Sequence, residues 1–276
     1  MARLCILLSI GVASMLLSGS IRVATTAPSE THALIEMSEH CLIGGVQNQK
    51  WISADRFLKT LKSSGGFEFY SLQGSAGEIA LKRNAESECH ESWTGKTPSD
   101  VKGGIAIQSP SWNVMPRLPR AIDPKDETYT EIVSDVLKGA GIKKPDVKIS
   151  QAYKVDLDGD GKEEVVIVAN RYAKGFRELS GVGNETSVGD YTLVLVRKIV
   201  GEKLQNIVLA KAVWLTGNGY DGPLPRANHL SAIADLNGDG VMELVFYSAY
   251  HEGSGSVVIQ LDGSKATTVL ECSCEH

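Results

Sequence analysis

The chain has 276 residues, of which 42% are hydrophobic and 22% are charged. This composition is ordinary for a globular protein, and the length allows one large domain or two smaller ones with ample core. The net charge of −5 and the lack of a long basic run argue against nucleic acid or an anionic membrane surface as a partner.

Residues 1–20 are predicted to be a signal peptide. Arg3 provides the positive start, residues 4–17 form a short apolar run, and small residues follow at 18–20. The run is short for a membrane span, and no second apolar run of that kind follows it. We therefore expect a secreted or periplasmic protein with no membrane span after cleavage. Cleavage near residues 25–27 and a retained N-terminal anchor are the alternatives.

The cysteines predict disulfide bonds. Removal of the signal peptide removes Cys5 and leaves Cys41, Cys89, Cys272 and Cys274. An even number of cysteines in an exported protein indicates disulfides, with three connectivities open. We favour a Cys41–Cys89 bond within the N-terminal region. Cys272 and Cys274 would then form a local bridge or stay reduced, and their pairing with the other two is the remaining alternative.

Residues 34–107 are predicted to form a small α+β region. Ser53 can cap a short helix, because serine accepts hydrogen bonds from free N–H groups in a first helical turn. The apolar face of this helix would consist of Phe57, Leu58 and Leu61. Strands are expected at 67–70 and 78–81, where aromatic and aliphatic residues are bounded by turn residues.

Residues 108–123 are predicted to be a linker, because they contain several prolines and few continuous apolar stretches. The clearest helix of the chain follows at 124–138. Asp126 and Glu127 favour its N-terminal dipole, and Gly139 ends it. Its apolar residues recur at helical spacing, so this helix is expected to pack on a sheet and to begin a third region, residues 124–276.

Two nine-residue stretches of this region have nearly the same sequence. Residues 156–164 read DLDGDGKEE and residues 235–243 read DLNGDGVME, so six of nine positions agree. In a short loop around a hard cation, side-chain oxygens of the first, third, fifth and ninth residues converge, together with the carbonyl of the seventh. Glycine at the sixth position permits the sharp turn. Calcium takes six to eight oxygen ligands and suits this spacing best, with acidic hairpin turns as the alternative.

The sequence therefore predicts two calcium sites. The expected ligands are Asp156, Asp158, Asp160, Lys162 and Glu164 in the first loop, and Asp235, Asn237, Asp239, Val241 and Glu243 in the second. Lys162 and Val241 would contribute their carbonyl oxygens only. Because Asn237 is neutral, the first loop has four carboxylates and the second has three, so we expect the first to bind calcium more strongly.

Both loops lead into apolar stretches that are typical of buried strands. An EF-hand would need a glutamate at the twelfth position and helices on both sides, but that position holds Ile167 or Phe246. Four strands are expected in each repeat. They are 147–155, 164–170, 191–198 and 204–214 in the first, and 229–234, 243–250, 256–261 and 266–272 in the second.

The predicted fold class is mainly β with some α. It consists of two propeller-blade-like four-stranded antiparallel meanders plus the small α+β N-terminal region. Neither meander can bury both faces alone, so the two are expected to share a core with the rest of the chain. The polar insertions 171–190 and 215–228 are long enough to be functional loops.

A loop of the pattern D-x-[DN]-x-D-G-x-x-E that leads into a hydrophobic strand resembles the FG-GAP/VCBS repeats, including the calcium loops of integrin α-subunit propellers. The resemblance covers about residues 148–270, and its specific part is the two loops. It implies calcium ligands at the matching carboxylate and amide positions. A propeller usually has four to eight blades, whereas two units are found here.

Two functional hypotheses follow from these patterns. The first is an exported calcium-binding β-repeat protein that acts as a non-catalytic binding or adhesion module for a protein or carbohydrate ligand. The alternative is a secreted hydrolase with structural calcium ions and an active site in the insertions. Its candidate residues would be His229, His251, Asp221 and Glu252, which have no spacing typical of a catalytic motif.

Overall fold

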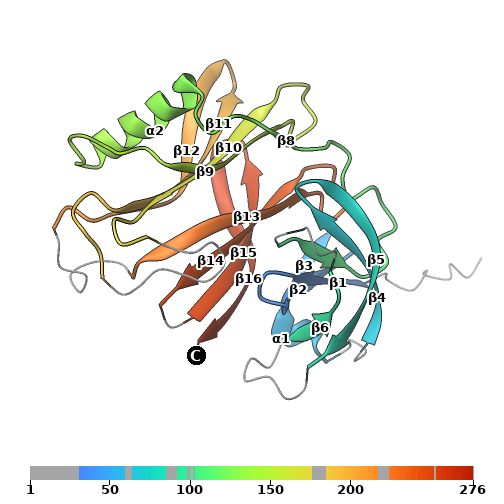
Figure 1. The fold of residues 1–276 in the computed structure, drawn as a ribbon. Helices are drawn as coiled ribbons and strands as arrows, with labels where there is room; N and C mark the ends of the chain where they lie inside the picture. Colours follow the sequence, from blue (N-terminus) through green and yellow to red (C-terminus); the bar gives the residue numbers. More distant parts are fainter. Residues whose placement is uncertain are drawn as a thin grey trace, which may run out of the picture.

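The computed structural model describes residues 31–59, 64–84, 92–97, 101, 103–175, 185–216, 224–251 and 253–275. The predicted signal peptide lies outside these residues. Within them the fold is mainly β, with three antiparallel sheets and few helices (Figure 1). Neither described helix is long and apolar enough to cross a membrane.

The N-terminal region is a seven-stranded sheet with the order β3-β2-β1-β7-β4-β5-β6. Its strands are β1 (Thr31–Glu36), β2 (Cys41–Gln47), β3 (Lys50–Ser53), β4 (Ser64–Ser71), β5 (Gly74–Arg83), β6 (Trp93–Gly95) and β7 (Ile105–Ile107). The strands expected at 67–70 and 78–81 lie within β4 and β5. Helix α1 (Ala54–Phe57) is one turn long, and the Ser53 hydroxyl donates to Asp55 and caps no backbone N–H. Leu61, expected on its apolar face, lies outside the described residues.

A five-stranded sheet with the order β12-β11-β10-β9-β8 contains the first predicted meander. Its strands are β8 (Arg120–Ala121), β9 (Ile149–Val155), β10 (Glu164–Arg171), β11 (Tyr191–Val200) and β12 (Lys203–Val213). Helix α2 (Glu127–Gly139) covers one face of it (Figure 1). The helix starts three residues later than predicted, because the Asp126 carboxylate accepts from the Thr128 N–H at 2.9 Å and makes Asp126 the N-cap.

The second predicted meander is the four-stranded sheet β13-β14-β15-β16. Its strands are β13 (Arg226–Ala234), β14 (Glu243–Tyr250), β15 (Gly253–Asp262) and β16 (Lys265–Glu275). All eight strands predicted for the two repeats are present, and both meanders are antiparallel as expected. The first meander differs by the short additional strand β8, which pairs with β9.

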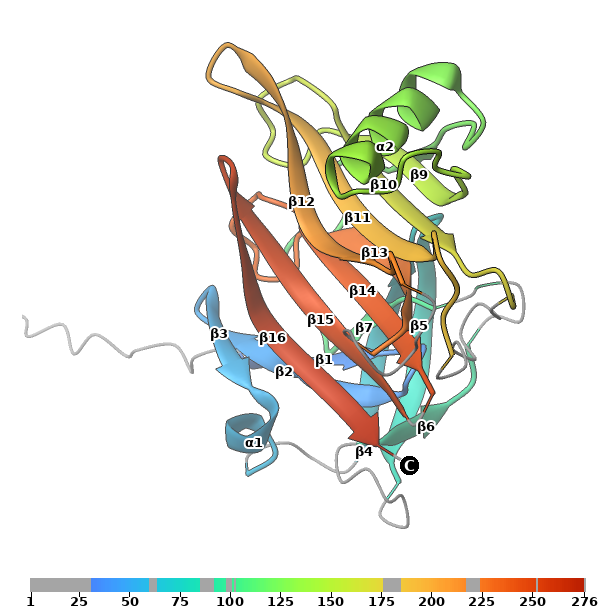
Figure 2. The same cartoon turned by 90° about the vertical axis from the view of Figure 1, so that its left-hand side faces the viewer.

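The three sheets and α2 stack as layers (Figure 2). On β10, Ile167 faces α2 whereas Val166 faces the second meander and belongs to the same core cluster as Leu244. The opposite face of the second meander packs on the N-terminal sheet, and Val245 and Ile105 belong to one core cluster there. Because neighbouring side chains of a strand point to opposite faces, burial of both faces explains the uninterrupted apolar runs of the sequence.

Residues 108–123, predicted to be a linker, lie against the other layers. Val114 is 1% exposed and belongs to the core shared by the N-terminal sheet and the second meander, with Trp112 packed against that core. The Val114 carbonyl accepts a hydrogen bond from the Asp235 N–H at 2.8 Å. This segment therefore reaches the start of the second loop.

The predicted Cys41–Cys89 disulfide is wrong. Cys41 in β2 is bonded to Cys272 in β16, with 6.6 Å between their Cα atoms and 231 residues between them in sequence. The bond is made because the second meander stacks on the N-terminal sheet, which sequence spacing does not reveal. Cys274 is also disulfide-bonded, whereas Cys5 and Cys89 lie outside the described residues.

Candidate metal centre in two repeated loops

The two loops have the same backbone conformation. The glycines at the fourth and sixth positions all have positive φ, which L side chains rarely adopt. The values are 76° for Gly159, 84° for Gly161, 78° for Gly238 and 89° for Gly240. The sequence correctly predicted a sharp turn at the sixth position of each loop.

The side chains of the two loops also bind the backbone in the same way. In each loop the first carboxylate accepts from the N–H groups of both glycines, and the ninth carboxylate accepts from the second residue. The first-loop distances are 2.7 Å for Gly159 N to Asp156, 3.0 Å for Gly161 N to Asp156 and 2.8 Å for Leu157 N to Glu164. The second-loop distances are 2.7 Å for Gly238 N to Asp235, 2.9 Å for Gly240 N to Asp235 and 2.9 Å for Leu236 N to Glu243.

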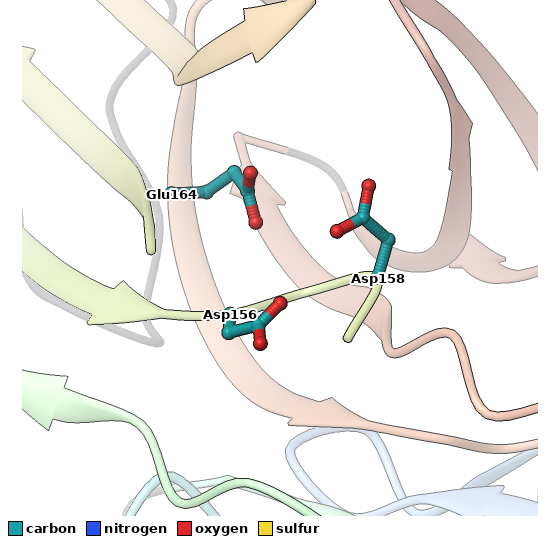
Figure 3. A group of neighbouring side chains, drawn as sticks. All are labelled: Asp156, Asp158 and Glu164. Atoms are coloured by element: carbon teal, nitrogen blue, oxygen red, sulfur yellow. The ribbon is translucent and has the colours of Figure 1, made fainter. Parts of the chain in front are cut away.

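In the first loop three predicted ligands converge. Carboxylate oxygens of Asp156, Asp158 and Glu164 all lie within 4.8 Å of one another, and the three groups point toward a common space (Figure 3). Glu164 is buried, Asp156 is half-buried and Asp158 is exposed. These three residues could hold a metal ion. Among the described residues, they form the one such group of carboxylate, imidazole or thiolate ligands.

A lysine that sequence analysis did not select lies against this group. The Nζ atom of Lys198 in β11 is 2.6 Å from Asp158 Oδ2 and 2.9 Å from Glu164 Oε1. Its side chain is only 6% exposed. Burial opposes the ammonium form, but the hydrogen bonds that Lys198 donates to both carboxylates, with the attraction of their charges, outweigh it and raise the pKa of Lys198 above its usual value.

The second loop is more deeply buried. Asp235 and Asn237 are each 4% exposed, and Glu243 is fully buried. One oxygen of Glu243 accepts from Leu236, but the other, Oε1, is buried without a hydrogen-bond partner. An unpartnered buried carboxylate oxygen is costly, and a bound cation would satisfy it. The donor set therefore fits a hard cation such as calcium.

The pKa values of two carboxyl groups in the second loop show that negative charge there is poorly compensated. Burial, with repulsion from Asp239 and Asp235, raises the pKa of Glu243 to about 9. Burial also raises the pKa of Asp235, against hydrogen bonds from the backbone of Gly240 and Gly238. No Lys or Arg among the described residues forms an ion pair with these carboxylates.

The fifth and seventh positions take the same arrangement in both loops. Asp160 accepts from the Lys162 N–H at 2.8 Å, and Asp239 accepts from the Val241 N–H at 2.8 Å. Asp160 and Asp239 are exposed. Asp160 lies outside the group of three converging carboxylates in the first loop.

Residues outside the pattern hold the two loops together. Arg117 donates to the carbonyls of Asp156 and Leu157 in the first loop, and to that of Gly240 in the second at 2.7 Å. A direct backbone bond of 2.8 Å joins Met242 N to the Leu157 carbonyl. The two candidate sites are therefore neighbours that share one guanidinium.

Trp112 and Gln49 cover the second loop. The Trp112 indole N–H donates to the Asp235 carbonyl at 2.8 Å, and its ring packs against Gly238. Gln49 Nε2 donates to the Gly238 carbonyl at 2.6 Å. A cavity of about 240 Å³ lies beside this contact and is lined by Asn237 and Trp112 among others. These contacts explain why the second loop is the more buried one.

The residues proposed for a hydrolase do not meet in one described site. His229 lies in β13 and His251 follows β14, whereas Asp221 and Glu252 lie outside the described residues. Cavities of about 580 Å³ and 470 Å³ border the two insertions. Neither cavity is lined by a described histidine or by a carboxyl group with a raised pKa.

Comparison of the chain with protein-family models, with curated proteins and with solved structures finds no match.

Proposed function

We propose that this is an exported calcium-binding β-repeat protein that acts as a non-catalytic binding or adhesion module. The observation that carries the proposal is the buried, unpartnered Oε1 of Glu243 in a loop whose other predicted ligands are Asp235, Asn237 and Asp239. The equivalent convergence of Asp156, Asp158 and Glu164 in the first loop supports the same cation-binding design. In this proposal bound calcium fixes a loop of this pattern at the start of the strand that it leads into.

Export is supported by the sequence of residues 1–20 and by the Cys41–Cys272 disulfide, because disulfides persist in oxidising compartments. Calcium is abundant outside cells, so even a weak site, with a dissociation constant on the order of 10⁻⁴–10⁻³ M as in extracellular modules, would be occupied there. A binding role is compatible with a stack of sheets in which calcium fixes a loop between two strands. The ligand would be a protein or a carbohydrate.

Titration calorimetry of the mature protein with calcium, and with magnesium as a control, tests the metal assignment. We expect calcium binding that magnesium does not match, because magnesium demands a tighter octahedral shell and keeps its waters. Absence of calcium binding at millimolar concentration would refute the proposal.

The ligand assignment needs a separate experiment. Glycan and protein arrays probed with the mature protein in calcium and in chelator should give a signal that depends on calcium. Turnover in a screen against peptide, ester, glycoside and phosphate substrates, lost on substitution of a histidine or acid outside the loops, would instead favour the hydrolase.

A further inference from the structure

The strand register identifies which residue faces the ninth position of each loop. In the first meander Val165 pairs with Arg197, and in the second Leu244 pairs with Ile259. One step further along each antiparallel ladder, Lys198 stands opposite Glu164. The equivalent step places Gln260 opposite Glu243. The two loops therefore differ at a position that lies outside the nine-residue pattern, on the neighbouring strand.

Lys198 contacts the oxygens that a metal would use in the first loop. Glu164 Oε2 is engaged by the Leu157 N–H, and the remaining oxygen, Oε1, is 2.9 Å from Lys198 Nζ. Asp158 Oδ1 accepts from the Asp160 N–H, and its Oδ2 is 2.6 Å from the same Nζ. The ammonium thus bonds to the third and ninth positions together and offsets one of their two negative charges.

Gln260 makes no equivalent contact in the second loop. Its Nε2 donates to Asp239 Oδ2 at 3.3 Å, whereas Glu243 Oε1 has no partner. An amide carries no charge, so the carboxylates of Asp235, Asp239 and Glu243 have no cation of their own among the described residues. The second loop therefore has a buried carboxylate oxygen without a partner, where the first loop has an ammonium bound to the equivalent oxygen.

We propose that Lys198 is a built-in cation that closes the first loop to calcium, so that the protein binds one calcium ion, in the second loop. The proposal rests on the proposed calcium-binding function and deepens it. Calcium in the first loop would have to displace the ammonium and leave it buried without a partner, which is unfavourable. The order of affinity expected from the number of carboxylates is thereby reversed. With Lys198 included, four carboxylates and one ammonium in the first loop have the same net charge as three carboxylates in the second, so the cost of displacing the ammonium decides the order.

A reciprocal exchange of the two residues tests the proposal. The stoichiometry of calcium binding is measured by titration calorimetry on the mature protein. We expect one ion for wild type, two for Lys198→Gln, none for Gln260→Lys, and one for the variant that carries both changes. Lys203→Gln removes an exposed lysine at the start of the neighbouring β12 and should leave the stoichiometry at one.

Terbium luminescence locates the ion in the same variants. Trp112 packs against the second loop, so indole excitation should sensitise terbium bound there. Wild type should give sensitised emission that calcium competes away. Gln260→Lys should abolish this emission, and the double exchange should weaken it, because the ion moves to the first loop. Trp112→Phe in the wild-type background should remove the sensitised emission, which identifies Trp112 as the energy donor.

The outcomes that would refute the role of Lys198 differ from those that would refute calcium binding. Two calcium ions in wild type, or one ion in both wild type and Lys198→Gln, would overturn the role of Lys198 and leave calcium binding intact. No binding by wild type and by Lys198→Gln would overturn the proposed function itself. Gln260→Lys is a second test, because half-buried Gln260 can be replaced without removing a partner of Glu164. If a folded Gln260→Lys variant binds one calcium ion as wild type does, the inference is also refuted.

Discussion

The two loops share a backbone and differ in what surrounds it. The first loop is open to solvent at Asp158 and has a lysine against its ligands, whereas the second is covered by Trp112 and has a buried carboxylate oxygen without a partner. The same nine-residue pattern can therefore hold either a side-chain ammonium or, in our proposal, a metal ion. The neighbouring strand decides between them, because it faces the ninth residue of the loop.

The largest effect is expected when the lysine is removed. Lys198→Met leaves Glu164 buried without its counter-charge, and breaking a buried ion pair in this way costs about 3–5 kcal/mol. We expect this loss of unfolding free energy in chelator, measured by urea denaturation. Gln260→Met is the matched change in the second meander and should cost far less, because Gln260 makes one long hydrogen bond of 3.3 Å to exposed Asp239 and its loss leaves no buried charge. Equal losses for the two variants would show that the loops do not differ in charge compensation.

The second largest effect is expected from calcium addition, which should stabilise the protein through the second loop only. A ligand at 100 times its dissociation constant adds about 2.7 kcal/mol to stability if it binds only the folded state. We expect this gain for wild type and for Asp156→Asn, and its loss for Asp235→Asn. The gain is the difference between denaturation in calcium and in chelator for each variant, so the cost of the substitution itself cancels. A gain lost only in Asp156→Asn would place the ion in the first loop.

Arg117 provides a test of whether the two loops are coupled. Its guanidinium donates to carbonyls of both, so Arg117→Gln should destabilise the protein by about 1–3 kcal/mol and weaken calcium binding as well. Arg120→Gln, which removes an exposed ion pair with Glu163, is the control and should change neither. Unchanged calcium affinity in Arg117→Gln would mean that the second loop does not depend on its bond to Arg117.

Glu36 is a buried carboxylate outside the two loops, and both of its oxygens accept hydrogen bonds. It is fully buried and accepts from Ser38, Glu39 and the Ser256 hydroxyl. Burial outweighs these bonds and raises the pKa of Glu36 above 4.5. A carboxyl with a raised folded-state pKa binds its proton more tightly when folded, so its contribution to stability is full below the unfolded pKa and is lost as pH rises through the folded pKa.

The expected result is a difference that grows with pH. Glu36→Gln does not titrate, so its stability relative to wild type should rise as pH increases from 4 upward, measured by urea denaturation in chelator. Glu78→Gln removes an exposed carboxylate of β5 and is the control for the loss of one charge. We expect this to be the smallest of the effects, because the hydrogen bonds to Glu36 offset part of the burial. A relative stability that falls with pH would show that those bonds outweigh burial.

Much of the fold could be predicted from local sequence. All eight strands of the meanders were found because apolar runs and turn residues are neighbours in sequence. The start of α2 was predicted three residues early, since the spacing of apolar residues does not show that the Asp126 side chain binds Thr128 and caps the helix. The Cys41–Cys272 bond was missed because the two residues are brought together by the stacking of sheets.

The candidate site divides in the same way. The sequence by itself determined the two loops, their glycine turns and the convergence of carboxylates in the first, because these depend on residues within nine positions of one another. Only the tertiary structure decided what lies against those loops. Lys198 and Gln260 reach them through strand pairing, and Trp112 and Arg117 through the packing of residues 108–123. Charge compensation and burial act through space, so the pattern of a loop specifies its ligands and the surrounding fold specifies which cation they meet.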